Sequence, residues 1–151
     1  MIRVLRAVAG FDSFSAELCE ALGVPGPAES LAGLRRRGFV SAPGEAGDWF
    51  SLHTLLRDFG RERWPLDEGE RHVLLVRAAR WYELEGLLAE ALAAWRAADE
   101  PEEIVRVFTE RHVELIDGGF ADAVIDAAAG IPPELADVWA KHLWGVWPRP
   151  T

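Results

Sequence analysis

The apolar residues of this chain recur mainly at spacings of three and four residues, which is the period of an amphipathic helix. The first half is organised around one such stretch, residues 51–64. Its apolar positions, which fall on one helical face, are Leu52, Leu55, Leu56 and Phe59. The Thr54 hydroxyl can cap free N–H groups at the helix start, and Pro65 disfavours helical geometry at Trp64. We predict a helix over residues 51–64 with its leucine face directed into the core.

The pattern before this stretch predicts three helices and a pair of strands. The helices, each followed directly by a glycine, are expected over residues 2–9, 15–22 and 28–37. Ser15 is the expected N-cap of the second helix. Strand-forming residues at 39–41 and 49–52 flank a loop rich in turn residues. Three helices, a hairpin and a closing helix are the element order of a winged helix-turn-helix.

The chain after residue 64 is expected to be purely helical and repetitive. When it is shifted by 32 positions it matches itself, so that Gly86 meets Gly118 and Pro101 meets Pro133. Proline suits a helix start, where its missing N–H costs nothing. The residues expected on inward faces include Leu88, Ala91, Leu92, Trp95, Ile104, Phe108, Leu115, Ile116, Ala121, Val124, Ile125, Ala128, Val138, Trp139, His142, Leu143 and Val146.

These elements predict a mainly α fold with two domains. Residues 1–64 are predicted to form a winged helix-turn-helix with a small β-hairpin. Residues 65–151 are predicted to form an antiparallel solenoid of tetratricopeptide-like helical repeats, in which each unit buries its apolar side against its neighbours. The last helix reaches the end of the sequence without a polar capping helix, so we expect further repeats to follow in the natural protein.

The net charge of −9 lies entirely in the second half of the chain. Residues 1–65 carry eight basic and eight acidic side chains, whereas residues 66–151 carry eight basic and seventeen acidic ones. An acidic surface of this kind disfavours nucleic-acid binding. The lone cysteine, Cys19, sits at an expected core position, and neither a signal peptide nor a membrane-spanning run is present, so we expect a cytoplasmic protein without disulfides.

The third predicted helix ends in three arginines, Arg35, Arg36 and Arg37, where a DNA-reading helix carries groove-facing residues. Two readings remain open for them. They are candidate DNA contacts, or they are solvated side chains that interact favourably with the helix dipole. The N-terminal part of the same helix is small and slightly acidic, so we do not expect DNA binding by this segment.

Four stretches resemble the central region of large bacterial STAND-type ATPase transcription regulators, the MalT-like members of the LuxR family. The matching words are F-S-A-E-L-C-E-A-L (14–22), L-R-R-R-G-F (34–39), W-F-S-L-H-T-L-L-R-D-F (49–59) and R-A-A-R-W-Y-E-L-E-G-L-L-A-E-A-L (77–92). The resemblance implies an ATPase domain before the winged helix. It also implies tetratricopeptide-like repeats and a LuxR-type DNA-binding domain after it.

The resemblance further implies a role for His53, at the head of the 51–64 helix. In such proteins a histidine at this position touches the β-phosphate of bound ADP and holds the closed form. A helix N-terminus beside an imidazole is a suitable anion site, although a histidine at a strand-to-helix corner can equally be structural. ATP or ADP is expected as cofactor of the full-length protein. This segment contains no G-x-x-x-x-G-K-[ST] loop and is expected to bind neither.

Other site chemistry is not expected. His72, His112 and His142 fall on separate helices without metal-ligand spacing. No nucleophile–base pair is visible, and a buried thiol at Cys19 would stay protonated and inert. The chain is therefore not expected to be an enzyme.

Two classes of function remain. The favoured one is a regulatory interaction segment, whose winged helix relays nucleotide state and whose repeats bind an inducer, a protein partner or domains of the same chain. The partners in that case are the upstream ATPase domain and the downstream repeats. The alternative is an autonomous DNA-binding winged helix with a helical dimerisation tail, which the charge distribution disfavours.

Overall fold

The structure of the chain is a computed structural model that describes residues 1–42 and 48–146, with side chains described up to residue 141. Most of the predicted hairpin loop, and the predicted inward side chains His142, Leu143 and Val146, lie outside the described parts. The chain divides into two compact units, Met1–Ala78 and Ala79–Thr151. This division falls within one helix, and the predicted domain boundary after residue 64 stays a prediction.

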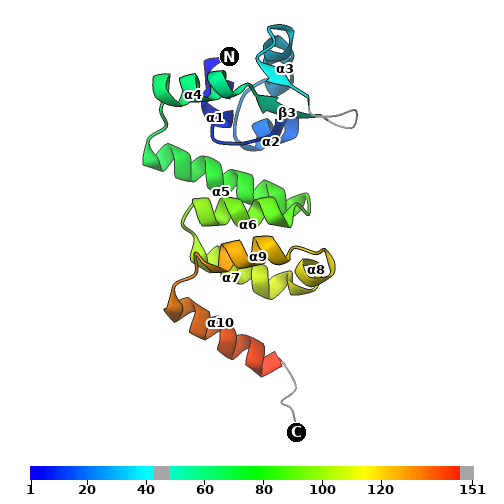
Figure 1. Ribbon diagram of the computed structural model, residues 1–151, viewed down its shortest axis with the longest axis vertical. Coiled ribbons are helices and arrows are strands. Elements are labelled where there is room, and N and C mark those ends of the chain that lie inside the picture. The colour runs from blue at the N-terminus through cyan, green and yellow to red at the C-terminus, as the bar shows by residue number, and fades with distance from the viewer. Residues whose placement is uncertain (43–47, 147–151) are drawn as a thin grey trace. The chain divides into compact units, whose positions relative to one another are not determined.

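The first unit combines short helices with a small antiparallel sheet (Figure 1). Its elements up to residue 63 are α1 (Ile2–Val8), β1 (Phe14–Ser15), α2 (Ala16–Ala21), α3 (Pro27–Arg36), β2 (Val40–Ser41), β3 (Trp49–Leu52) and α4 (Thr54–Arg63). The strand order is β1-β3-β2. The order of elements is consistent with the predicted winged helix. The core is apolar and comes from α1, α2, α3 and the three strands, with Val8, Phe14, Leu18 and Leu34 fully buried.

Strand β1 was not expected from the sequence. It is two residues long and pairs Phe14 with Phe50 and Ser15 with Trp49. Ser15 is also the N-cap of α2, as predicted, because its hydroxyl accepts a hydrogen bond from the Leu18 N–H at 3.1 Å. A two-residue strand is too short to show an alternation of apolar and polar residues in the sequence. Only its pairing with β3 in the structure identifies it as a strand.

The predicted helix over residues 51–64 is shorter than expected at its start. Ser51 and Leu52 belong to β3, where they pair with Ser41 and Val40. Helix α4 begins at Thr54, and His53 is its N-cap. The prediction that Thr54 caps the helix is therefore wrong, because the sheet holds the chain extended for two residues that the apolar pattern had assigned to the helix.

The leucine face of α4 is not buried, which corrects a second prediction. Leu55 is 75% exposed and Phe59 is 53% exposed, whereas only Leu52, in the strand, lies in the core. The buried residue of α4 is Gly60, and a Cβ built on it would lie 3.9 Å from the Ala9 Cβ at the end of α1. Helix α4 thus contacts the end of α1 through a glycine and not through its large apolar side chains.

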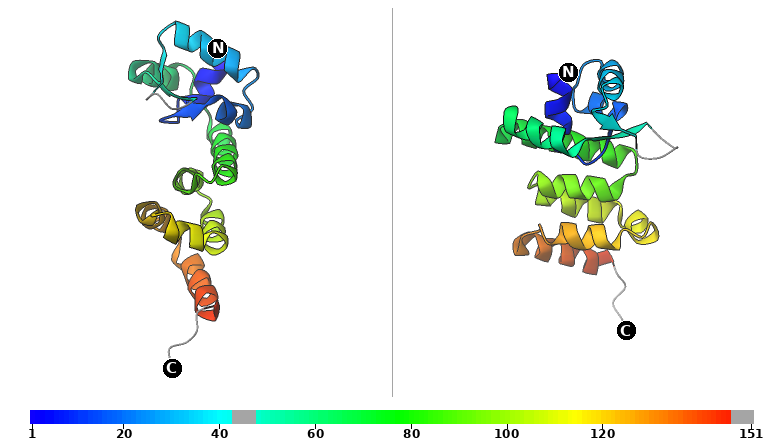
Figure 2. Two further views of the ribbon diagram at one scale, coloured as in Figure 1. Left: turned by 90° about the vertical axis from the view of Figure 1, so that its right-hand side faces the viewer. Right: turned by 45° about the horizontal axis from the view of Figure 1, so that its top comes forward.

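Helix α5 (Glu68–Leu84) begins in the first unit and ends in the second. The second unit continues with α6 (Leu88–Ala97), α7 (Pro101–Glu110), α8 (His112–Asp117), α9 (Ala121–Ala128) and α10 (Pro133–Val146). Within it α6 packs against α7 and α9, and α7 packs against α8 and α10 (Figure 2). Pro101 and Pro133 both open helices, at the predicted 32-residue interval. The tetratricopeptide-like class of this arrangement stays a prediction.

The inward faces were predicted best for α6, where Leu88, Ala91, Leu92 and Trp95 are all buried. The predicted inward residues from Ile104 to Ile116 do not share one helix, because the chain is broken at Arg111 into α7 and α8. The predicted inward residues that the structure exposes are Ile116 (74%), Ile125 (66%), Val138 (61%) and, on α9, Ala121 and Ala128. On α9 the buried residue is Ala127, so the predicted phase of that helix was wrong.

Candidate functional site

The candidate site of the first unit is the corner between β3 and α4, where His53 stands. Its backbone is held on both sides. The His53 N–H donates to the Phe39 carbonyl (N···O 3.1 Å), and the His53 carbonyl accepts from the N–H groups of Leu56 and Arg57, both at 2.9 Å. The residue as a whole is exposed, and its side chain does not cap the helix. The corner therefore fixes the backbone of His53 and leaves the imidazole accessible.

The start of α4 is electrostatically suited to an anion. No side chain caps the helix, and the N–H groups of Thr54 and Leu55 come before the first ones that bond the His53 carbonyl, so these two can meet an anion at the same corner. The first turn contains no acidic residue. Unpaired N–H groups carry partial positive charge, and the imidazole beside them offers a further N–H donor. The arrangement can bind a phosphate oxygen supplied from outside the unit.

Two arginines on α4 attach this helix to the segment between α1 and β1. The Arg57 guanidinium bonds both the carboxylate of Asp12 (3.0 Å) and the Asp12 carbonyl (3.2 Å). The Arg61 Nε donates to the Ala9 carbonyl at 2.9 Å. The apolar pattern of residues 51–64 makes no prediction for these two arginines. Their partners are 45 and 52 residues away in the chain, and no local pattern could have found them.

A third arginine holds the end of α4. The Arg6 side chain, on α1, donates to the carbonyls of Trp64 (3.4 Å) and Pro65 (3.0 Å) and pairs with the Glu70 carboxylate at 2.9 Å. The position and orientation of α4 are thus set largely by polar bonds to the region around α1. Its apolar outer side, formed by Leu55 and Phe59, contributes little to holding it.

The three candidate DNA contacts lie exposed at the end of α3. Arg35 and Arg36 line an open groove of about 660 Å³, which Glu17 and Asp48 also line. Arg37 is the C-cap residue, with its Nη1 2.7 Å from the Met1 Sδ. Two carboxylates beside the arginines oppose phosphate binding. The DNA-binding role of these arginines stays an untested alternative.

Cys19 lies on α2 and is fully buried. Burial, and secondarily the charge of Glu17, raise the pKa of its thiol to about 11. The thiolate, which is the reactive form, is therefore scarce at neutral pH. The position agrees with the predicted role of Cys19 as a core residue.

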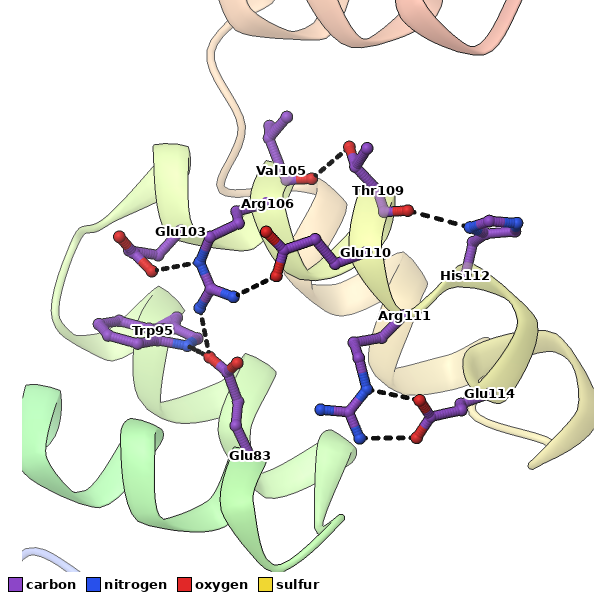
Figure 3. A network of polar contacts seen from close by, with 10 residues as sticks. All are labelled: Glu83, Trp95, Glu103, Val105, Arg106, Thr109, Glu110, Arg111, His112 and Glu114. Carbon is purple, nitrogen blue, oxygen red and sulfur yellow. Dashed lines mark hydrogen bonds and ion pairs between the residues drawn. The ribbon is translucent and has the colours of Figure 1, made fainter. Parts of the chain in front are cut away.

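The second unit carries a polar cluster that the sequence reasoning did not single out (Figure 3). The Arg106 guanidinium bonds three carboxylates, those of Glu83 (2.7 Å), Glu103 (2.8 Å) and Glu110 (2.9 Å). Glu83 also accepts from the Trp95 indole N–H at 2.6 Å. These bonds raise the pKa of Arg106, with the Glu83 bond as the largest cause. The cluster joins α5, α6 and α7, and only its part within α7 shows in the sequence, as acidic residues three and four positions from an arginine.

Neither a metal site nor a membrane-spanning helix is found in the described residues. Among them, no three side chains of the histidine, cysteine, aspartate or glutamate types are grouped to hold a metal ion. Of the scattered histidines, His112 has its Nδ1 3.0 Å from the Thr109 carbonyl oxygen of the preceding turn. No helix in residues 1–42 and 48–146 combines the length and apolarity needed to cross a bilayer.

Comparison with known proteins locates a family match in the first half of the chain. Residues 1–72 match the family model of the MalT winged helix domain. Searches of curated proteins and of solved structures gave no match. The match confirms the predicted winged helix and supports the interpretation of the chain as a MalT-like fragment. The LuxR family, the ATPase and the tetratricopeptide-like repeats remain predictions.

Proposed function

We propose that this chain is a regulatory interaction segment of a MalT-like, ATP-dependent transcription regulator of the cytoplasm. The observation that carries the proposal is the match of residues 1–72 to the MalT winged helix domain. The winged helix relays the nucleotide state of an ATPase domain, and the helical repeats bind an inducer, a protein partner or domains of the same chain. The segment itself is not an enzyme. ATP or ADP belongs to the ATPase domain.

His53 is the proposed nucleotide sensor. An ATPase domain docked at the β3–α4 corner would bring an ADP phosphate to the imidazole and to the open N–H groups of α4. The fixed backbone of His53 supports this role, because the backbone at the corner has no conformational entropy left to lose when the imidazole binds. The bonds from Arg57 and Arg61 to the segment after α1 provide a route by which a displacement of α4 would reach the rest of the unit.

The sensor role predicts that His53→Ala in the full-length regulator weakens ADP retention. A charge-assisted hydrogen bond is worth ~1.5–3 kcal/mol, so ADP affinity should fall roughly ten- to over a hundredfold and inducer-independent activation should rise. Calorimetric titration with ADP measures the first effect, and a reporter assay measures the second.

The matched control is Thr54→Ala. Thr54 is the exposed neighbour of His53 and does not cap the helix, so its replacement should change neither measurement. Arg57→Ala is unsuitable as a control, since it removes the bonds to Asp12. Unchanged ADP affinity in His53→Ala, with the helical circular-dichroism signal intact, would show that His53 is only a structural corner residue.

The alternative is autonomous DNA binding through Arg35, Arg36 and Arg37, supported by their exposure. At about 150 mM salt we expect the chain to bind duplex DNA only weakly and without sequence preference, because few phosphates can be neutralised. Nanomolar, sequence-specific binding that Arg36→Ala abolishes would favour this alternative over the proposed function.

A further inference from the structure

Helix α4, which packs beside α1 (Figure 1), contributes less to the core than the helices before it. Helices α1, α2 and α3 each bury at least two side chains, among them Val8, Leu18 and Leu34. Within α4 the buried residue is Gly60, and Leu56 is only half-buried. Because apolar burial is the main force that holds a helix in place, α4 lacks the attachment that α1, α2 and α3 have.

The aromatic contact of α4 is local to the helix. Phe59 meets the Trp64 ring edge-on, with 5.7 Å between the ring centroids. Trp64 is the C-cap residue of the same helix, so this contact moves with α4 and does not tie it to α1. The remaining large apolar side chain, Leu55, is 75% exposed.

The bonds that hold α4 to the region around α1 are polar and open to water. The Asp12 side chain, which is the ion-pair partner of Arg57, is 99% exposed. The Arg6 side chain, which bonds the carbonyl groups at the end of α4, is 33% exposed. Exposed ion pairs contribute little to stability and are screened by salt, because water replaces each partner when the pair opens.

Arg57 also bears an energetic cost when α4 lies on α1. Its side chain is 19% exposed, and its Nε is buried without a hydrogen-bond partner among the described residues. A buried donor without an acceptor is unfavourable, and water can satisfy it once the helix leaves. The arginine that anchors α4 therefore also favours its release.

The two ends of α4 allow it to move away from α1. At its start, Leu52 is buried in β3 and the His53 N–H bonds the Phe39 carbonyl, so the corner stays in place. At its end, residues 64–67 form neither helix nor strand before α5. We infer that α4 is a two-state element of the winged helix, which swings away from α1 about the β3–α4 corner while α1, α2, α3 and the sheet stay folded.

This conformational switch goes beyond the proposed function. It depends only on contacts within the first unit, and it needs neither a nucleotide nor an ATPase domain. None of the measurements below involves ADP or a variant of His53. A failure here is therefore distinguishable from a failure of the proposed nucleotide sensor.

A disulfide between α1 and α4 provides the test. The Ala9 Cβ and a Cβ built on Gly60 are 3.9 Å apart, which is an ordinary Cβ separation in disulfides. The double variant Ala9→Cys, Gly60→Cys of the full chain can be oxidised to tie α4 to α1 and reduced to free it. Cys19 is fully buried and does not compete. The readout is amide hydrogen exchange followed by mass spectrometry, at about 0.05 M and about 1 M salt.

Helix α3 is the internal reference, because it also has ten residues. A helix of this length is marginal without packing, so release exposes the α4 amides. In the parent chain they should exchange roughly tenfold faster than those of α3, and faster still at high salt. Oxidation of the double variant should remove both differences, and reduction should restore them. Equal exchange of α3 and α4 in the parent, or no effect of oxidation on α4, would overturn the inference.

Two arginines of α4 provide a comparison that needs no disulfide. Arg57→Ala removes the bonds to Asp12 and should speed α4 exchange roughly two- to fivefold. Arg63→Ala removes the same charge from an exposed side chain that has no partner among the described residues, and should change nothing. Asp12→Asn should repeat the effect of Arg57→Ala without altering the composition of α4. Equal effects of Arg57→Ala and Arg63→Ala would show that exchange reports helix propensity alone, and would overturn the inference.

Discussion

Helices α4 and α6 have the same length, ten residues, and both carry apolar residues at three- and four-residue spacings. In α6 five residues are buried, and in α4 only Gly60 is. The difference lies in the neighbours. Helix α6 packs against α7 and α9, whereas α4 packs against α1 through its glycine and is held by arginines. A helical apolar pattern therefore predicts the helix reliably, but it does not say whether the apolar face turns toward the same molecule.

The largest expected effect is a difference in the loss of stability between alanine variants of α6 and α4. Trp95 of α6 is 1% exposed, and Trp95→Ala should cost ~3–5 kcal/mol of unfolding free energy, because it leaves a large cavity. Leu55→Ala on α4 should change stability by less than ~0.5 kcal/mol, since Leu55 is already in solvent. Denaturant unfolding measures both. Comparable losses would mean that α4 buries its leucines in solution.

The polar cluster should show a smaller contrast between two partners of the same arginine. The Glu83 side chain is 12% exposed and accepts bonds from both Trp95 and Arg106. Glu83→Ala should cost ~1–3 kcal/mol, because the N–H of the buried Trp95 loses its acceptor and Arg106 loses its most buried carboxylate. Glu110→Ala removes a partner whose side chain is 58% exposed, and should cost ~0–1 kcal/mol. Equal losses in chemical unfolding would contradict the unequal burial.

Two glycines, Gly60 on α4 and Gly118 after α8, should respond to alanine substitution in opposite directions. The Gly60 variant tests how closely α4 approaches α1. The space beside Gly60 accepts a methyl group at ordinary contact distance from Ala9, so Gly60→Ala should stabilise the chain by ~0.5–1 kcal/mol through helix propensity. At Gly118 an added Cβ would lie 2.7 Å from the Glu114 carbonyl oxygen, and Gly118→Ala should destabilise. Thermal unfolding of both variants checks the opposite signs. Destabilisation by Gly60→Ala would mean that α4 lies closer to α1 than described.

The last prediction concerns the Cys19 thiol, which lies in the core to which α4 contributes no apolar side chain. Its effect on the unfolding free energy appears only at alkaline pH. Its pKa of about 11 in the folded chain exceeds the ordinary value of 9.0. The folded state therefore holds the proton longer, so this thiol stabilises the fold fully below about pH 9 and the contribution is lost as pH rises toward about 11. Unfolding free energies of the parent and Cys19→Ala, measured from pH 7 to pH 11, should converge over that interval. A constant difference would show that the thiol does not titrate there.

Local chemistry in the sequence was sufficient for several features. Ser15 caps α2, and Pro101 and Pro133 open helices, because capping and proline geometry depend only on adjacent residues. The element order of the winged helix followed from such signals together with helical periodicity. Cys19 lies in the core as predicted, and Leu18 and Leu22, which share its helical face, are buried with it.

Tertiary structure alone decided the features that depend on distant partners. The sheet took Ser51 and Leu52 from the predicted helix, and Arg57 and Arg61 found partners across about fifty residues of chain. The candidate site shows the same division. The sequence placed His53 at a strand-to-helix corner, but its exposure, and that of Leu55 beside it, depends on which surfaces pack together. Periodicity specifies which side chains share a face, and only the positions of the neighbouring elements determine which face is buried.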